Sequence, residues 1–256
     1  MGKKTDNKVA IVKPEDLSAS SMDYMASCAK GILGAIPFAG AAVAEITGYI
    51  VPNQRMDRLV RFVVSLNERL SAVEQALFET KKEEEYFVDL AEEILRQAAK
   101  SIADERRGCL ASLLKNSLSS DEMECVENKH LLQLFSDIND AELIILRSYS
   151  ERTFVDDKEF RELHKEIIDY PYRNIAAPQE AVDKATISRS YREHLTRLGL
   201  LENLYKVNSS SPKMMEIDKR TGKRIERGYQ ITKLGKLLLK RVSFEPIPQE
   251  QYPEGV

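Results

Sequence analysis

The chain has 256 residues and a formal net charge of −3. Charged residues make up 31% of it and aromatic residues only 7%, with no Trp, which is typical of an all-helical protein rather than a β-sandwich. The length indicates two domains, and the slightly negative charge excludes a chain built as a whole to coat nucleic acid.

Residues 1–22 are polar, and we expect them to form a flexible N-terminus. They lack the early apolar core and cleavage site of a signal peptide. The three cysteines, Cys28, Cys109 and Cys125, form no Cys-x-x-Cys pair. We therefore expect a cytoplasmic location, peripheral to the inner membrane if the apolar stretch described next leaves the core.

An apolar stretch runs from Gly31 to Val51, with Glu45 as its only charged residue. Its length approaches the roughly 20 residues that a membrane-spanning helix needs. Pro37 interrupts the stretch early, and an unpaired Glu45 would be costly in lipid. Both features argue against a simple membrane span.

Small residues in this stretch recur every four positions, at Gly40, Ala44 and Gly48. This spacing places them on one helix face, where another backbone or a membrane partner can approach closely. The pattern favours a tightly packed helical hairpin over 31–52. A segment that enters a membrane when triggered and a permanent span remain as alternatives.

A long amphipathic helix is predicted next, with Asn53 as its N-cap. Apolar residues then follow at alternating spacings of three and four over three heptads, at Met56, Leu59, Val63, Leu66, Leu70, Val73 and Leu77. Such a seam must be buried. An intramolecular helical bundle is the favoured outcome, and a homo-oligomer formed through the 56–77 helix is the alternative.

Further amphipathic segments complete a helical domain over residues 23–172. Asp104 and Gly108 are expected to loosen the chain before a helix that starts at Cys109. Caps are predicted in the cluster Ser119-Ser120-Asp121 and at Asn139 or Asp140. The expected helical segments are 87–102, 109–114, 131–135, 141–149 and an acidic, amphipathic one over 154–170.

The sequence LASLLKNSLSS (110–120), followed by HLLQLFSDINDAELIILRSY (130–149), resembles the central segment of bacterial abortive-infection alpha-type proteins. In that family a Leu-rich helix precedes a short loop and a second helix, behind an apolar stretch and a long charged helix. This chain departs from the pattern at Gly108-Cys109, where the family has an aromatic residue. The resemblance implies a role in phage defence, and it brings no catalytic residues with it.

Residues 173–256 are predicted to form a winged-helix (α+β) domain with a short tail. The pattern indicates a short helix over 178–184 and a turn over 185–187. A second helix, capped by Ser188, would then end at Gly199.

The wing is predicted from alternating apolar residues around a tip at Gly222. A closing helix would begin after its cap, Thr232. The phrase LTRLGLLE…GYQITKLGKLLLKRV resembles winged-helix domains of bacterial regulators. The alternating residues are Met215, Ile217, Ile225, Tyr229 and Ile231.

Positive charge gathers in this part of the chain. Between Ile175 and Glu245 there are fifteen Lys and Arg against eight Asp and Glu. Contact with DNA is therefore predicted, and protein binding through a solvated hairpin is the alternative. Glu193, on the polar face of the second helix, does not suit a general phosphate surface. The candidate nucleic-acid-binding residues are Arg189 and Arg197 on that helix, and Lys219, Arg220, Lys223, Arg224 and Arg227 on the wing.

The sequence carries no motif for enzyme chemistry. The histidines, His130, His164 and His194, have no metal-ligand spacing, and no phosphate-binding or nucleophile motif occurs. The sequence thus predicts a protein that is not an enzyme and uses no cofactor or metal. The first hypothesis is a bacterial defence protein with a winged-helix sensor or adaptor. The others are a DNA-binding transcription regulator with a helical oligomerisation domain and a structural adaptor.

Overall fold

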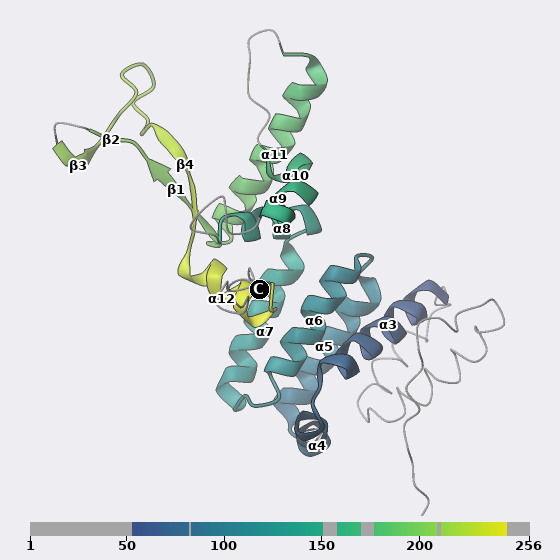
Figure 1. Ribbon diagram of the computed structural model, residues 1–256. Helices are drawn as coiled ribbons and strands as arrows, with labels where there is room; N and C mark the ends of the chain where they lie inside the picture. Colours follow the sequence, from purple (N-terminus) through teal and green to yellow (C-terminus); the bar gives the residue numbers. More distant parts are fainter. Residues whose placement is uncertain (1–52, 82, 151–157, 170–176, 209–210, 245–256) are drawn as a thin grey trace, which may run out of the picture.

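The computed structural model describes residues 53–81, 83–150, 158–169, 177–208 and 211–244 (Figure 1). In these residues the fold is mainly α-helical, with two small antiparallel sheets, as the composition predicted. The predicted flexible N-terminus and the stretch 31–52, with Gly40, Ala44 and Gly48, lie outside the described residues. No described helix has the length and apolar character that crossing a membrane requires.

The predicted long helix is two helices, α3 (Asn53–Arg69) and α4 (Ala72–Lys81), so a continuous seam over 56–77 is wrong. Ser71 starts the second helix, because its backbone N–H donates to Glu74 Oε2 at 2.7 Å while the backbone N–H of Glu74 donates to its hydroxyl at 3.3 Å. This capping box redirects the chain. Val73 is consequently 78% exposed, whereas Leu66 is only 3% exposed.

The core forms where α3 packs against α5 (Glu85–Lys100) and α6 (Asp104–Asn116), and α5 packs against α7 (Glu122–Asp137). The buried part of the heptad seam is used within the chain, as the favoured alternative predicted. Helix α6 begins at Asp104 and continues through Gly108, so the predicted loosening there is wrong. A Cβ on Gly108 would lie 3.0 Å from the Arg69 guanidinium, so the glycine allows α3 to approach α6.

Helix α8 (Asp140–Ser148) follows α7, and both begin with the caps that were predicted. The side chains of Asp121 and Asn139 each accept a hydrogen bond from the backbone of the third helical residue. Arg106 of α6 fixes this junction, because its Nε lies 2.6 Å from Asp140 Oδ1 and its Nη1 donates to the Phe135 carbonyl at 2.8 Å. Arg106 therefore joins the first turn of α6 to the junction between α7 and α8.

The described part of the predicted 154–170 segment forms two short helices, α9 (Lys158–Leu163) and α10 (Lys165–Ile168). Next comes α11 (Gln179–Arg197), one continuous helix, so the predicted turn over 185–187 is wrong. That tripeptide is Ala-Thr-Ile, with no Gly or Pro to end a helix. Ser188, predicted as a cap, instead lies buried inside the helix.

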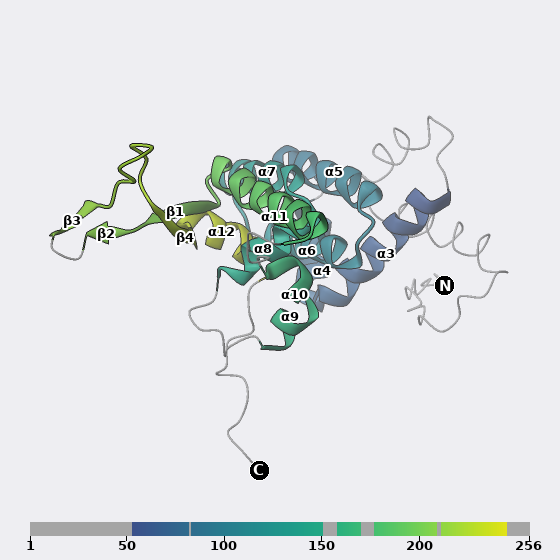
Figure 2. The same cartoon turned by 90° about the horizontal axis from the view of Figure 1, so that it is seen from above.

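The end of α11 follows the prediction, with Leu198 as C-cap and Gly199 at a φ of 72°. Strand β1 (Leu201–Tyr205) pairs antiparallel with β4 (Glu226–Ile231). Between them, β2 (Val207–Asn208) pairs with β3 (Ser211–Met215). Figure 2 shows these strands leaving the helices as one long arm.

The chain returns from the arm into α12 (Lys233–Arg241), and Thr232 is its cap as predicted, accepting from the backbone N–H of Gly235 at 3.0 Å. Helix α12 packs on α6 and α7. Asn116 Nδ2 also donates to the Arg241 carbonyl at 2.8 Å. The last helix therefore anchors the foot of the arm to the helical bundle.

Candidate nucleic-acid interface

The arm, residues 201–231, consists of a stem and two fingers. The stem is the β1–β4 pair, whose register runs from Leu201 opposite Ile231 to Tyr205 opposite Glu226. Beyond Tyr205 the chain forks. The first finger is the β2–β3 hairpin, and the second is the turn that includes Gly222 (Figure 1).

Three backbone hydrogen bonds close the fork in a ring. Lys206 N–H donates to the Ile225 carbonyl at 2.9 Å, and Ile225 N–H donates to the Glu216 carbonyl at 3.0 Å. Glu216 N–H completes the ring by donating to the Lys206 carbonyl at 2.8 Å. Because each residue both donates and accepts, the fork satisfies its backbone groups without a continuous ladder.

The second finger ends in the turn that the sequence predicted. Asp218 N–H donates to the Lys223 carbonyl at 2.8 Å, and Gly222 has a φ of 68°. The Asp218 carboxylate accepts from the backbone N–H of Arg220 at 2.8 Å, which lowers the pKa of that carboxyl. The aspartate is thus part of the turn itself.

Among the side chains that the structure describes, six cationic ones are exposed along the arm. The five that the sequence predicted are brought onto one finger and the adjoining stem, and Lys206 joins them from the fork. Against them stand four carboxylates, two on the stem, one at the fork and one in the turn of the second finger. Lys206 was missed because β1 was not predicted as a strand. The cations are Lys206, Lys219, Arg220, Lys223, Arg224 and Arg227.

The outer face of α11 looks across a hollow of about 480 Å³ toward the stem. Arg189 and Arg197 are exposed, as predicted, and Arg189 Nε lies 2.8 Å from Glu193 Oε1. Arg197 lines this hollow and Arg189 does not. Carboxylates from α11 and from the stem line it as well, so its charge is mixed. Its lining residues are Ser190, Glu193, Thr196, Arg197, Asn203, Glu226 and Tyr229.

The position of α11 is held from beneath by a buried arginine. Arg192 is 3% exposed, and its Nε donates at 2.9 Å to the hydroxyl of Tyr149, the C-cap residue of α8. Its Nη2 donates to the Ile168 carbonyl at the end of α10, also at 2.9 Å. One guanidinium therefore fixes α11 against both α8 and α10. Its spacing is a signal that the sequence analysis missed, because Arg192 follows Ser188 by four residues and precedes Leu195 by three, on the buried face of α11.

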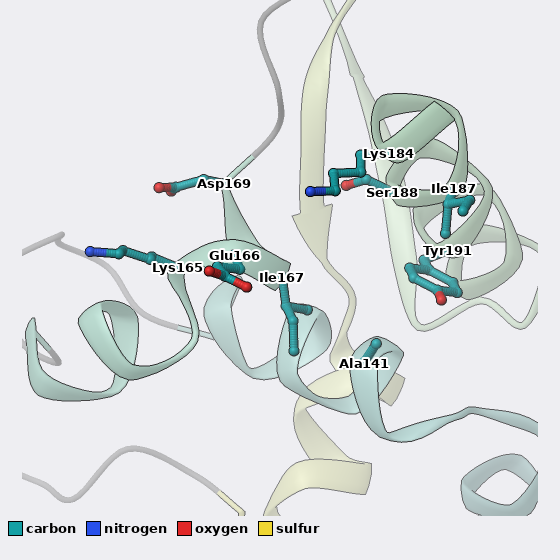
Figure 3. A pocket seen from close by; sticks show the side chains of 9 residues that line it. All are labelled: Ala141, Lys165, Glu166, Ile167, Asp169, Lys184, Ile187, Ser188 and Tyr191. Carbon is teal, nitrogen blue, oxygen red and sulfur yellow. The ribbon is translucent and has the colours of Figure 1, made fainter. Parts of the chain in front are cut away.

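A second hollow, of about 580 Å³, lies on the other side of α11, between that helix, α8 and α10 (Figure 3). Ala141, Ile167, Ile187 and Tyr191 give it apolar walls. Its two lysines are paired within their own helices or turns, Lys165 with Glu162 and Lys184 with Glu180. This hollow therefore has no unbalanced positive charge that would attract an anion. Within the described ranges, no cluster of three or more His, Cys, Asp or Glu side chains is placed to hold a metal ion.

Among the described features, the arm therefore carries the largest set of exposed cationic side chains, with α11 beside it. Comparison with known proteins adds no relative. No family model matches the chain, and neither a curated protein nor a solved structure matches it.

Proposed function

We propose that this chain is a non-enzymatic DNA-binding protein of the abortive-infection alpha type, in which α8 to α12 form a winged helix. The order of elements supports this proposal, because three helical segments (α8, α9–α10 and α11) precede a strand, a protruding hairpin, a returning strand and a closing helix. Helix α11 packs on α8 and on β1. In this assignment α11, rather than a helix starting at Ser188, takes the position of the groove helix, and the arm is the wing.

The observation that carries the proposal is the set of six exposed cations on an arm that stands away from the helices (Figure 2). Cations on such a projection can reach phosphates without a clash between DNA and the bundle. Each neutralised phosphate releases a condensed counterion, so this kind of binding weakens steeply with salt. The overall charge of −3 does not oppose it, because the charge is distributed unevenly.

In this proposal the arm supplies most of the affinity for DNA. Helix α11 contributes little to discrimination between DNA sequences. The outer face of α11 pairs Arg189 with Glu193, and a carboxylate there repels phosphates. One observation favours the alternative of a sequence-reading transcription regulator. Arg197 is exposed at the end of α11 that adjoins the stem, and an arginine can bind guanine with two hydrogen bonds.

Salt-dependent binding of the full chain to labelled duplex DNA, measured by fluorescence anisotropy, tests the proposal. The variant Lys219→Ala/Arg220→Ala/Lys223→Ala removes three cations of the second finger. We expect weaker binding to any duplex. The slope of log affinity against log salt should fall by about 0.9 for each phosphate that the variant no longer neutralises.

The matched control is Lys233→Ala/Lys236→Ala/Lys240→Ala, which removes three exposed cations from α12 and changes the net charge equally. It is expected to keep most of the affinity. Equal losses of DNA affinity in both variants would mean that binding depends on the net charge of the chain and not on the arm. Absence of salt-dependent binding by the wild-type chain would end the proposal.

The defence role rests on the resemblance of residues 110–149 and is tested separately. Bacteria that express the chain are challenged with a panel of phages, and protection is compared between the two triple variants. We expect protection to disappear with the arm variant and to persist with the α12 variant. Protection that survives the arm variant would separate defence from DNA binding.

A further inference from the structure

We propose that the arm bends DNA by pressing an aliphatic strip, defined as Val207, Met215 and Ile217, between base steps from the minor groove. The inference rests on the proposed DNA binding and adds its mode. These side chains are 53%, 44% and 58% exposed, although their backbones are paired in a strand or a bridge. Large aliphatic groups exposed together on a projection indicate a contact surface.

The strip follows the backbone of the fork from β2 and β3 toward the second finger. Val207 and Met215 are directly paired across β2 and β3, so their side chains point to the same side. Ile217 lies two residues beyond Met215, just past the end of β3. Ile217 is in turn bridged to Arg224, whose guanidinium lies 5.6 Å from the ring centre of Tyr205. An aliphatic surface is therefore continuous with a cation.

Cations flank the strip on the strands around it. Lys206 precedes Val207, while Lys223 and Arg224 stand on the strand that returns from the second finger. An object with apolar groups in the middle and cations at its edges is complementary to a minor groove, whose floor is base edges and whose two walls are phosphates. This charge complementarity selects duplex DNA as the partner.

An anionic membrane is the other surface that combines apolar and negative character, and the composition of the fork argues against it. The sequence from Lys206 to Gly228 contains no Phe, Trp or Tyr, and the flanking Tyr205 and Tyr229 belong to the strands of the stem. Membrane-surface segments rely on Trp and other aromatic anchors at the interface. Side chains that wedge between base steps are more often Leu, Ile, Met, Phe or Pro, and Met215 and Ile217 are of this kind.

A wedge of this kind must unstack a base step, so it prefers DNA in which unstacking is already easy. Nicked duplexes and flexible pyrimidine–purine steps fulfil this condition. The full chain should therefore bind a nicked duplex about tenfold more tightly than the intact one, because the unstacking cost is largely removed. Binding should also bring the two ends of an intact duplex closer together.

The test uses a duplex with a donor and an acceptor dye at its ends, with energy transfer and anisotropy recorded in the same titration. The variant Val207→Thr/Met215→Gln/Ile217→Thr keeps side-chain size approximately while removing apolar surface. We expect it to bind the intact duplex with the wild-type salt slope, to lose the rise in energy transfer, and to lose the preference for the nick.

The matched control, Ile102→Thr/Met123→Gln/Leu163→Thr, removes three exposed apolar side chains that lie away from the arm. It should bend DNA as the wild type does. Circular dichroism of both triple variants verifies that the fold is intact.

The outcomes separate this inference from the function on which it rests. If the wild-type chain shows no salt-dependent binding to duplex DNA, the proposed function fails. If it binds but neither bends DNA nor prefers the nick, or if the strip variant bends DNA normally, only the wedge is overturned. If the strip variant loses binding to phosphatidylserine vesicles but bends DNA as before, the strip is a membrane contact.

Discussion

Glu142 of α8 contacts His194 of α11, with 2.7 Å between Glu142 Oε1 and His194 Nδ1. The other carboxylate oxygen of Glu142 accepts a hydrogen bond from the backbone N–H of Asn139 at 2.8 Å. One buried side chain thus completes the N-terminal cap of α8 and holds α11 on it.

Because Glu142 makes both contacts, substitutions of Glu142 and His194 should have non-additive effects on the free energy of unfolding. Glu142→Ala should lower the free energy of unfolding by about 1–3 kcal/mol, since it removes a buried carboxylate together with both of its hydrogen bonds. Glu142→Gln should cost less because its amide oxygen can still accept. A double-mutant cycle with His194→Ala, measured by urea denaturation, should show coupling of at least about 0.5 kcal/mol. Strictly additive losses would mean that the two side chains do not interact in solution.

The break between α3 and α4 predicts opposite results at two positions of the same heptad pattern. Leu66→Asp places a charge in the core and should cost several kcal/mol. Val73→Asp changes an exposed position and should stay within about 0.5 kcal/mol of the wild type. Thermal denaturation followed by circular dichroism distinguishes them. A large loss at Val73 would restore the single continuous helix.

Gly235 is predicted to tolerate no side chain. A Cβ there would overlap the carbonyl oxygen of Leu200 and lie 2.8 Å from Ile231 Cγ1, and neither neighbour can move freely. Gly235→Ala should therefore lower the free energy of unfolding by about 1–3 kcal/mol, as overpacking does. Gly228→Ala, on the stem, meets nothing within 4 Å and serves as the control. Similar stability of both variants would show that α12 can shift away from β1.

Cys109 predicts a loss of stability at high pH. Burial raises the pKa of its thiol to about 12, from an ordinary value of 9.0. Above pH 9 the unfolded chain would lose this proton while the folded chain keeps it, so the free energy of unfolding falls as pH rises toward 12. Between pH 8 and pH 10 the wild type should lose about 1.4 kcal/mol more than Cys109→Ala does.

The measurement is guanidinium denaturation of both proteins at the two pH values, in a Cys28→Ser background. At pH 8 the folded protein should also react slowly with a thiol reagent, because Cys109 and Cys125 are both buried. Equal pH dependence in the two proteins would contradict the assignment of the effect to Cys109.

The features predicted correctly from the sequence are those decided by residues close together in the chain. Asn139 caps α8 and Thr232 caps α12 because a short polar side chain meets a backbone N–H three residues later. Gly199 ends α11 and Gly222 shapes the turn because both positions need a positive φ. Each of these signals lies within one turn of chain.

The errors arose where two local signals competed or where partners lie far apart. At Ser71 the heptad pattern outweighed a Ser-x-x-Glu capping box that was readable in the sequence. At Ser188 the capping signal was followed and was wrong. Ser188 lies inside α11, which contacts between Arg192 and the ends of α8 and α10 hold in place. Strand β1 was missed because its partner, β4, lies beyond the whole fork. The hollow between α11 and the stem depends on the same distant pairing.

The ring of hydrogen bonds at Lys206, Glu216 and Ile225 makes the fork a self-contained addition to the fold. Directly below it, Tyr205 and Glu226 already face one another as paired residues, and a short reverse turn could join them there. Chain beyond that point can therefore be shortened, lengthened or exchanged at little cost to the bundle, because α12 and the stem remain in place. The surface that we propose to bind DNA is thus also the part most open to replacement, so its binding preference could evolve without renewed selection for folding.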